Sequence, residues 1–457
     1  MNKFSIANFK SGSSVHFIGI GGISMSALAE MMLYLGYKVS GSDRDDSDAL
    51  SKLRSKGAEI NVGQRKENIK NPDLICYTAA ISKDNPELIR AKEIGVPVIE
   101  RAELLGELMT LYKFPLAIAG THGKTTTTSM LSLILLAAEK DPTILVGGEL
   151  PQIEGNYRQG STDYLVLEAC EYVESFLHFH PFLSIITNIE ADHLDYFVNL
   201  NNIISAFQKF ARLNSPQGHI IVCFDDKNIQ SIVQDLGENV VKFGIDAKNC
   251  EFVAENIKPN DKKGTDFDVT YKGEPFLSLS MNVSGKHIVY DALACVAAAM
   301  SLGIEKEHIK AGLENFYGTK RRFEKLGSFD GVDIVDDYAH HPTEIEATLN
   351  SAKEMGYNQV WCIFQPHTYT RTKAFLNDFA KALSIADHVI IADVYPAREK
   401  YDGTIHSCDL ASLINNGVYI NDFGAIERYI KKNTKKGDLV ISMGAGSVTE
   451  IGHNLVK

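Results

Sequence analysis

A glycine-rich stretch in the second quarter of the chain has residues that could bind a phosphate group. The segment IAGTHGKTTTT, residues 118–128, places Lys124 and Thr125 directly after Gly123. The commoner phosphate-binding loop has another glycine five residues before the one that precedes the lysine, and this chain has Ile118 there. Backbone N–H groups of such a turn can still point at an anion, and a helix that begins near Lys124 adds the positive end of its dipole.

The side chains of this loop predict a nucleoside triphosphate with a metal ion. Lys124 would supply a full positive charge to the β- and γ-phosphate oxygens, and the hydroxyl of Thr125 is placed to bind Mg²⁺. The alternative is that the Gly-Lys-Thr turn only begins a helix and binds nothing. The order strand, loop, helix favours phosphate binding. The residues expected at the ATP phosphates are Gly120, Thr121, His122, Gly123, Lys124, Thr125 and Thr126.

A second glycine-rich loop lies near the N-terminus, between an apolar run and a helix-like pattern. Dinucleotide-binding loops have this position, although Ser24 stands where their third glycine would be. Asp43, at the end of the next expected strand, could accept a ribose hydroxyl. NAD, another nucleotide diphosphate and a purely structural turn all fit the loop. The candidate binding residues are Gly19, Gly21, Gly22, Ile23, Ser24 and Asp43.

Three blocks of alternating strands and helices must position these loops, which is typical of parallel α/β domains. The second block starts near Phe114 and contains the loop with Lys124 between an expected strand and an expected helix. Residues 249–281 alternate polar and apolar side chains, which indicates a small antiparallel sheet. A third α/β block follows residues 316–324. Buried strands are expected at 15–20, 38–43, 74–78, 97–100, 116–120, 163–169, 182–188, 332–338, 359–364, 388–393 and 438–444.

Composition excludes several classes of protein. The 457 residues are too many for one core, and the formal charge of −12 argues against a nucleic-acid-binding protein. Seven scattered cysteines without a C-x-x-C pair predict neither a zinc site nor a disulfide framework. The N-terminus lacks the apolar core of a signal peptide, and no apolar run approaches the ~18 residues of a membrane span. A cytoplasmic enzyme is therefore expected.

Seven motifs occur in an order that resembles the Mur ligase family, and the resemblance covers about residues 14–450. The short phosphate loop is shared by all Mur and folylpolyglutamate ligases. The pair DDYAHHPTE and FQPHTYTR is more specific, and resembles the members that join L-alanine to UDP-N-acetylmuramate. The motifs are GTHGKTTTT, EACEY, TNIEADHLDYF, GTKRRFE, DDYAHHPTE, FQPHTYTRT and GAGS.

This resemblance implies three α/β domains. Residues 1–112 would form a Rossmann-like domain for the UDP-sugar. Residues 113–318 would form a central P-loop ATPase domain with a parallel sheet and a small antiparallel sheet. Residues 319–457 would form a Rossmann-like domain for the amino acid, with a hinge near Gly318.

The resemblance also implies the reaction, in the synthesis of peptidoglycan precursors. ATP would phosphorylate the carboxylate of UDP-N-acetylmuramate, and the amine of L-alanine would attack the acyl phosphate. ATP and Mg²⁺ are thus the expected cofactors, and the two other substrates are the expected partners. Whether the protein is a monomer or a homodimer is left open by the sequence.

Catalytic residues are carried over from the motifs on the same basis. Glu168 resembles the family's magnesium carboxylate, with Glu171 as a weaker candidate. His193 resembles a histidine placed near a second Mg²⁺. Arg322, and with less support Arg321, would reach the γ-phosphate as an arginine finger does.

The remaining carried-over residues would bind the nucleotide sugar and the amino acid. Asp337 would contact the ATP ribose. Arg371 suits the carboxylate of L-alanine, because a guanidinium can hold a carboxylate by two hydrogen bonds. Tyr338, His340 and His367 would complete this site, while His341 is expected only to cap the following helix.

Three motifs depart from the family pattern. Thr368 stands where many relatives have arginine, and EACEY replaces EADES. Asp291 stands where asparagine would both donate to and accept from adenine, and a carboxylate only accepts. We therefore expect weaker adenine selectivity or a water-bridged contact there. Cys170 is expected to be a buried apolar residue, with a redox role as the alternative.

Other functions fit less of the sequence. Another ligase of the group could use a preformed peptide or a later amino acid, but FQPHTYTR argues against it. An NAD-dependent dehydrogenase would explain the N-terminal loop and leave Lys124 and Thr125 without a role. A nucleotide-binding regulatory protein without turnover is a further alternative.

Overall fold

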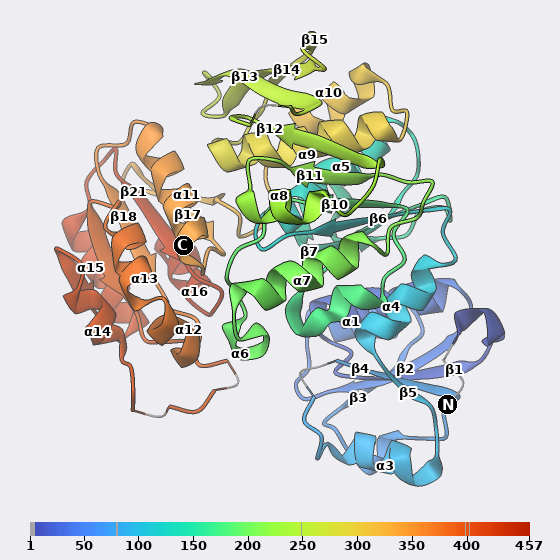
Figure 1. The fold of residues 1–457 in the computed structure, drawn as a ribbon. Helices are drawn as coiled ribbons and strands as arrows, with labels where there is room; N and C mark the ends of the chain where they lie inside the picture. Colours follow the sequence, from blue (N-terminus) through green and yellow to red (C-terminus); the bar gives the residue numbers. More distant parts are fainter. Residues whose placement is uncertain (1–4, 79–80, 248, 398, 402) are drawn as a thin grey trace. The chain divides into compact units, whose positions relative to one another are not determined.

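The computed structural model describes residues 5–78, 81–247, 249–397, 399–401 and 403–457. Its strands form three sheets, and the chain has the expected three-domain α/β fold (Figure 1). The described residues up to 253, together with 294–312, form one compact unit, and residues 254–293 with 313–457 form a second. The division falls inside strand β13 (Phe252–Pro259) and inside helices α9 (Lys286–Ser301) and α10 (Lys306–Glu314). The expected domain boundaries near 112 and 318 remain predictions.

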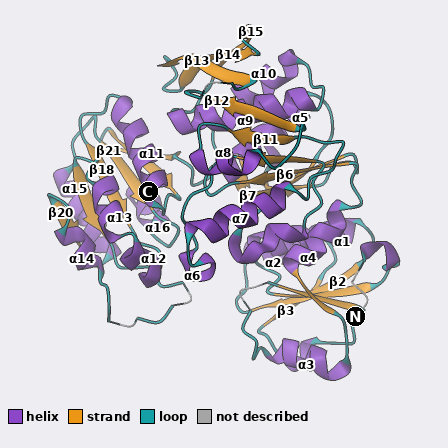
Figure 2. Ribbon diagram, in the orientation of Figure 1, coloured by secondary structure: helices purple, strands orange, loops and turns teal. Residues whose placement is uncertain are grey.

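The N-terminal sheet has five parallel strands in the order β3-β2-β1-β4-β5. This order is that of a doubly wound domain, in which ligands bind at the carboxyl ends of the strands. Helices α1, α2 and α4 lie on one side of the sheet and α3 on the other (Figure 2). The elements are β1 (Ser14–Ile18), β2 (Lys38–Asp43), β3 (Glu59–Val62), β4 (Leu74–Tyr77), β5 (Val98–Glu100), α1 (Ile23–Tyr34), α2 (Asp48–Ser55), α3 (Pro86–Ile94), α4 (Arg101–Met109), and the 3₁₀ turns η1 (Ile6–Asn8) and η2 (Lys66–Asn68).

The central sheet has ten strands in the order β15-β14-β13-β12-β11-β10-β6-β9-β7-β8. Its middle strands are parallel, and the expected antiparallel excursion is the β14–β15 hairpin at one end of the same sheet. The strands are β6 (Phe114–Ala119), β7 (Thr143–Leu150), β8 (Gly155–Arg158), β9 (Tyr164–Glu168), β10 (Leu183–Ile186), β11 (Ile220–Cys223), β12 (Val240–Gly244), β13 (Phe252–Pro259), β14 (Thr265–Tyr271) and β15 (Glu274–Ser280).

Helices and 3₁₀ turns connect these strands. Helix α5, which follows the phosphate loop, is buried from Thr125 to Leu135, because it packs on β7 and β9. These elements are α5 (Lys124–Ala137), α6 (Leu194–Phe197), α7 (Leu200–Ala211), α8 (Lys227–Val233), α9 (Lys286–Ser301), α10 (Lys306–Glu314), η3 (Pro151–Ile153) and η4 (Tyr172–His178).

The C-terminal sheet has six strands in the order β16-β17-β21-β18-β19-β20, parallel except for the edge strand β16. The elements are β16 (Glu324–Phe329), β17 (Val332–Asp337), β18 (Val360–Phe364), β19 (His388–Ile391), β20 (Gly417–Tyr419), β21 (Leu439–Met443), α11 (Pro342–Glu354), α12 (Tyr369–Ala374), α13 (Leu376–Leu383), α14 (Ser407–Ser412), α15 (Phe423–Asn433) and α16 (Thr449–Leu455).

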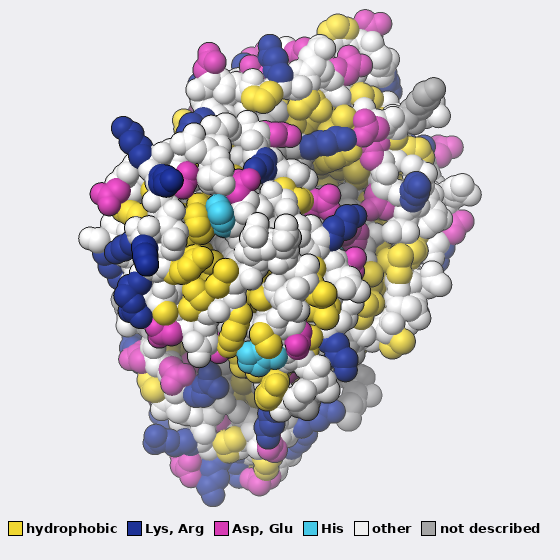
Figure 3. All heavy atoms as spheres, turned by 90° about the vertical axis from the view of Figure 1, so that its left-hand side faces the viewer, with side chains coloured by type: hydrophobic (Ala, Val, Ile, Leu, Met, Phe, Trp, Pro, Cys, Tyr) yellow, Lys and Arg dark blue, Asp and Glu magenta, His cyan; other side chains and the backbone are white. Residues whose placement is uncertain are grey.

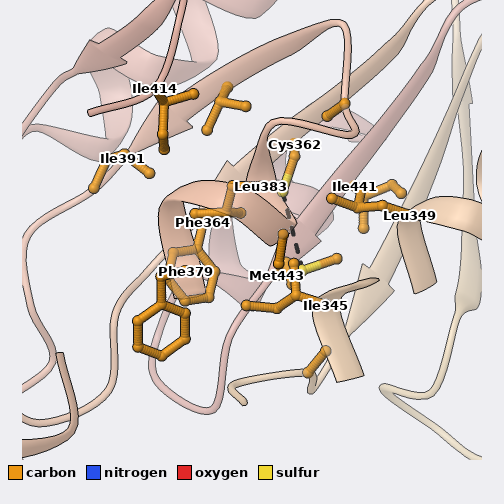
Figure 4. Packing of buried hydrophobic residues seen from close by; sticks show 14 of the residues in the cluster. Ile345, Leu349, Cys362, Phe364, Phe379, Leu383, Ile391, Ile414, Ile441 and Met443 are labelled. Carbon is orange, nitrogen blue, oxygen red and sulfur yellow. Dashed lines mark hydrogen bonds between the residues drawn. The ribbon is translucent and has the colours of Figure 1, made fainter. Parts of the chain in front are cut away.

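Both faces of this sheet are covered. Alternate residues of each strand point to opposite faces, so Cys362 and Phe364 enter one apolar cluster and Trp361 and Ile363 the other. In the first cluster the strands pack on Ile345 and Leu349 of α11 and on Phe379 and Leu383 of α13 (Figure 4). Because the faces are buried, the polar residues available for chemistry lie where the strands end.

Three further observations concern the helices, the surface and the cysteines. Among the described residues, no helix is long and apolar enough to cross a membrane. Figure 3 shows one face of the molecule, on which basic and acidic side chains are interspersed. All seven cysteines are free thiols.

Candidate active site

The phosphate loop joins β6 to α5, as predicted, and needs its glycines for two separate reasons. Gly120 has φ +148°, and a Cβ there would lie 1.9 Å from Oγ1 of Thr187. Gly123 has φ +81° and precedes the first residue of α5. A side chain at Gly120 would collide with its neighbour, and one at Gly123 would be strained.

A neighbouring strand end fixes the conformation of this short loop. The amides of Thr121 and His122 donate to the main-chain and side-chain oxygens of Asn188 at 3.1 and 2.8 Å. The hydroxyl of Thr187 donates to the carbonyl of His122 at 2.6 Å, and the amide of Glu190 donates to Oγ1 of Thr121 at 2.9 Å. Residues 187–190, which follow β10, thus hold the phosphate loop in place through these hydrogen bonds. The first amides of α5 have no partner within the helix and can face an anion.

Lys124 is held by the loop and by an acidic residue from the next strand end. Its Nζ donates to the carbonyls of Gly120 and Thr121, the latter at 3.1 Å, and lies 3.0 and 3.2 Å from the two carboxylate oxygens of Glu171. The side chain of Glu171 is 3% exposed. Burial lowers the pKa of Lys124, but Glu171, Cys170 and Glu168 together raise it more, so that the pKa lies above its ordinary value. Lys124 therefore carries its charge.

Glu171 also approaches His193. The Nε2 atom of His193 lies 4.0 Å from Oε1 of Glu171 and 3.7 Å from Oδ2 of Asp192. The imidazole packs against the ring of Tyr172, with centroids 4.7 Å apart. The structure therefore brings Lys124 and His193 together through Glu171. Glu171 was only a weaker candidate from the sequence, because nothing in its spacing pairs it with a lysine 47 residues away.

Glu168 ends β9, as predicted, and is fixed by the neighbouring strand. Its Oε1 accepts a hydrogen bond of 2.5 Å from the amide of Gly147 in β7. A Cβ at Gly147 would lie within 3.0 Å of both carboxylate oxygens, so this close approach requires glycine. The hydroxyl of Thr125 and the carboxylate of Glu168 are hard oxygen donors of the kind that Mg²⁺ prefers, so these residues fit the ion. The nitrogen of His193 is a less typical ligand.

The N-terminal glycine loop lies between β1 and α1. The amides of Gly19 and Ile20 donate to the carbonyl of Ser42, and the amide of Gly21 donates to Oδ2 of Asp43 at 2.7 Å. The other carboxylate oxygen of Asp43 accepts from the amide of Arg44 at 2.7 Å. Asp43 thus supports the turn. Gly22, Ile23 and Ser24 are exposed at the start of α1.

In the second unit, Asp337 is a buried carboxylate at the end of β17. Its two oxygens accept hydrogen bonds from the amides of Ala339 and Phe323 at 2.7 and 2.8 Å. Burial raises the pKa of Asp337 to about 6, although Arg322 and these amides oppose the rise. Arg322 itself lies 3.8 Å from Glu344 and over the ring of Tyr338.

The four residues expected to bind the amino acid lie together beyond the ends of β17 and β18. The ring centroids of Tyr338 and His340 are 5.4 Å apart, and those of His340 and His367 are 5.9 Å apart. Nη1 of Arg371 lies 3.4 Å from Nδ1 of His367. The ring of Tyr395, which the sequence did not indicate, stacks on His367 at 5.8 Å.

Three other residues singled out from the sequence are Asp291, His341 and Cys170. Asp291 is 5% exposed on α9. His341 caps α11 in a reciprocal arrangement with Glu344, which confirms the role expected for it. Cys170 is half-buried rather than buried as expected, and desolvation still raises the pKa of its thiol, which disfavours the reactive thiolate.

Comparisons with known proteins agree with this geometry along the chain. Three family models match: "Mur ligase family, catalytic domain" at residues 14–113, "Mur ligase middle domain" at 118–299, and "Mur ligase, glutamate ligase domain" at 321–446. The first covers the N-terminal glycine loop, and the second covers the phosphate loop, Glu168 and His193.

Relatives resemble the chain over almost its whole length. It is 51% identical to a UDP-N-acetylmuramate–L-alanine ligase of Acetivibrio thermocellus, over all of this chain and 98% of the relative. A protein of the same name from Alkaliphilus metalliredigens is 49% identical over 97% of this chain and 96% of its own.

Solved structures give the same picture. A UDP-N-acetylmuramate-alanine ligase of Thermotoga maritima has a TM-score of 0.81 at 32% identity, and the match covers 97% of this chain and 98% of that one. A murein peptide ligase of Psychrobacter arcticus has a TM-score of 0.73 at 26% identity, with the same coverage.

Proposed function

The chain belongs to the Mur ligase family, and on this basis we propose that it uses ATP to join L-alanine to the carboxylate of UDP-N-acetylmuramate. The observation that carries the proposal is the 51% identity, over all of this chain, to a relative named for that activity. The peptide ligase neighbour is less similar, at 26% identity. A dehydrogenase is not supported, because it leaves the phosphate loop without a role.

The reaction needs ATP because a carboxylate is a poor electrophile whose leaving group would be oxide. Attack of a carboxylate oxygen on the γ-phosphorus releases ADP and gives an acyl phosphate. The amine of L-alanine then attacks the acyl carbon, the C–O bond to phosphate breaks, and the amine loses a proton. The products are an amide, ADP and inorganic phosphate, and the phosphate retains one oxygen of the original carboxylate.

Charge neutralisation at the transferred phosphoryl group is the main task of the first unit's residues. Lys124 and the first amides of α5 would bind the β- and γ-phosphates. Thr125 and Glu168 would hold Mg²⁺, with His193 near a second ion; when bound, the metal neutralises charge that develops on the phosphate oxygens. Gly120, Thr121, His122, Gly123 and Thr126 would shape this end of the ATP site.

The second unit would supply the remaining contacts. Arg322 would add positive charge at the γ-phosphate, Asp337 would contact the ribose, and Asp291 would face adenine. Arg371 would bind the alanine carboxylate beside Tyr338, His340 and His367. One methylene in an apolar pocket is worth only ~1–3 kcal/mol, so we expect glycine and serine to be poorer substrates rather than excluded ones.

The N-terminal loop, with Gly19, Gly21, Gly22, Ile23, Ser24 and Asp43, would bind the diphosphate and ribose of the UDP-sugar. The carboxylate of Asp43 accepts from the amide of Gly21, which fixes the glycine loop beside the residue that would contact the ribose. We place the domain boundaries near residues 112 and 318. We also propose that the enzyme acts in the cytoplasm.

Release of inorganic phosphate from ATP tests the proposal. Phosphate should appear only when both UDP-N-acetylmuramate and L-alanine are present. A preformed peptide that replaces L-alanine with equal effect would indicate a peptide ligase instead, and an absorbance change with NAD would indicate a dehydrogenase. Lys124→Ala should abolish phosphate release, whereas Lys209→Ala, which removes an exposed lysine of α7, should not. A folded Lys124→Ala enzyme with near wild-type turnover would contradict the mechanism.

A further inference from the structure

The ion pair of Lys124 and Glu171 has a consequence for nucleotide binding. A lysine ammonium has three N–H donors. In the structure these donors face the carbonyl of Gly120, the carbonyl of Thr121 and the carboxylate of Glu171. A phosphate oxygen can therefore accept from Lys124 only if one of these three partners gives way.

The two carbonyls cannot give way easily, because they belong to a fixed loop. The amides of Thr121 and His122 are bound to Asn188, and the hydroxyl of Thr121 is bound to the amide of Glu190. Thr187 also lies against this part of the backbone, since a Cβ at Gly120 would collide with it and its hydroxyl donates to the carbonyl of His122. Glu171 instead reaches Lys124 with a side chain that can rotate.

Glu171 also lies near a second partner, His193, and a bound phosphate would repel its carboxylate. The Nε2 atom of His193 lies 4.0 Å from Oε1 of Glu171, so a small rotation would exchange Lys124 for the imidazole. A carboxylate and a phosphate that approach the same ammonium repel each other, and the repulsion is strong where the carboxylate is only 3% exposed.

We propose that Glu171 is a positioning residue that competes with the β-phosphate of the nucleotide for Lys124. It holds the lysine charged and aligned in the loop, and thereby weakens nucleotide binding, until the phosphate displaces it toward His193. This inference rests on the proposed binding of ATP at the loop. It assigns to Glu171 a role different from that of Glu168, which is bound to Gly147 and supplies a metal ligand.

The two possible roles of Glu171 predict opposite changes in nucleotide affinity when its charge is removed. If Glu171 only supports the site, its loss weakens nucleotide binding together with the fold. If Glu171 competes with phosphate, its neutralisation strengthens nucleotide binding while it lowers the melting temperature, because the ammonium of Lys124, whose side chain is only 17% exposed, loses its counter-charge. Glu174 offers a matched control on the same segment, since it pairs with Lys209 at 3.2 Å and is a third exposed.

Isothermal titration calorimetry with ADP and with AMP, both in EDTA, tests the proposal without any contribution from metal or turnover. Glu171→Gln should bind ADP about tenfold more tightly than wild type, whereas its affinity for AMP, which lacks the β-phosphate, should change less than twofold. Glu174→Gln should match wild type with both nucleotides. If Glu171→Gln does not fold, Glu171→Asp, whose shorter side chain reaches Lys124 less well, should show the same sign with a smaller change.

Unchanged or weaker ADP binding by the folded Glu171 variant would overturn the proposal, as would an equal gain for AMP and ADP. Failure of the wild-type protein to bind ADP would instead overturn the assignment of the loop to ATP, and this inference with it. The two failures are therefore distinguishable from the wild-type titration alone.

Discussion

The guanidinium of Arg321 lies against the carboxylate of Asp336, with Nε 3.2 Å from Oδ2. Asp336 is fully buried in β17 and also accepts hydrogen bonds from the hydroxyls of Ser442 and Thr449 at 2.6 and 2.8 Å. Nη2 of Arg321 donates to the carbonyl of Gly444 at 2.7 Å. Arg321 therefore ties the glycine-rich loop after β21 to β17, whereas its neighbour Arg322 has no such network in the part of the chain that the structure describes.

This difference predicts opposite effects of substituting the two arginines. Arg321→Ala leaves a buried carboxylate without its counter-charge, so it should lower stability by about 3 kcal/mol or more. Arg322→Ala should lower kcat by about 10³-fold, which is the lower end of the range for an arginine finger. Its melting temperature should change little. Thermal unfolding and initial rates of phosphate release measure the two quantities separately.

Arg322→Lys serves as the control, because it keeps the charge and loses the fork of donors. It should restore part of the lost kcat. The assignment would be wrong if Arg322→Ala were as unstable as Arg321→Ala, or if its kcat stayed close to that of the wild-type enzyme.

The elements that carry the site could be predicted from sequence because each is a short apolar run followed by polar residues. The strands that end at Glu168, Asp337 and Phe364 were expected at nearly their observed positions. Hairpin β7–β8 was not predicted, since Gly147 and Gly148 interrupt its apolar pattern. That hairpin nonetheless supplies the amide that fixes Glu168.

Contacts between distant segments could not be predicted in the same way. Local sequence patterns do not indicate that Glu171 pairs with Lys124, or that residues 187–190 hold the phosphate loop. The different partners of Arg321 and Arg322 also depend on how β17 and β21 pack together, since the two residues are adjacent and of one type. The resemblance to a family supplied these candidates, and the structure supplied their partners.

The pKa of Asp337 predicts a pH-dependent contribution to stability. Burial raises the pKa of this carboxyl from 3.8 to about 6, so the folded state binds the proton more tightly than the unfolded state does. The contribution is fully present below the unfolded pKa and is lost as the pH rises through about 6. The difference in melting temperature between wild type and Asp337→Asn should therefore fall as the pH rises from about 4 to about 7.

Asp333 on the same strand gives a control of opposite sign. Burial raises its pKa, but hydrogen bonds from Lys325 and Tyr357, together with nearby lysine charges, lower it by more. The pKa of Asp333 therefore lies below its ordinary value. Its contribution is present above the unfolded pKa and is lost as the pH falls. The wild-type advantage over Asp333→Asn should therefore shrink in acid, and parallel pH trends for the two variants would contradict both assignments.

Asp291 predicts a gain of affinity. An asparagine amide can donate to a ring nitrogen of adenine and accept from the exocyclic amino group, whereas the buried carboxylate of Asp291 can only accept. One neutral hydrogen bond is worth ~1 kcal/mol, so Asp291→Asn should tighten ATP binding about fivefold. Titration with a fluorescent ATP analogue measures this affinity. GTP should not gain, because guanine has an N–H donor at the ring nitrogen where adenine has an acceptor, and a carboxylate already suits that donor. An unchanged affinity for ATP would contradict the idea.

Arg371 predicts a defect confined to the amino acid. Because its guanidinium would bind the alanine carboxylate through charge-assisted hydrogen bonds, worth ~1.5–3 kcal/mol, Arg371→Ala should raise KM for L-alanine by at least about tenfold. KM for ATP should stay near the wild-type value, and initial rates at varied concentrations of each substrate separate the two. Equal increases in both KM values would indicate a general loss of structure instead.

The transfer of oxygen from substrate to phosphate tests the central claim most directly. UDP-N-acetylmuramate with an ¹⁸O-labelled carboxylate would be converted with ATP and L-alanine, and the released inorganic phosphate analysed by mass spectrometry. An acyl phosphate intermediate predicts one ¹⁸O atom in each phosphate, because the carboxylate oxygen that attacks the γ-phosphorus leaves with it. Unlabelled phosphate, or ¹⁸O found in AMP, would contradict the account.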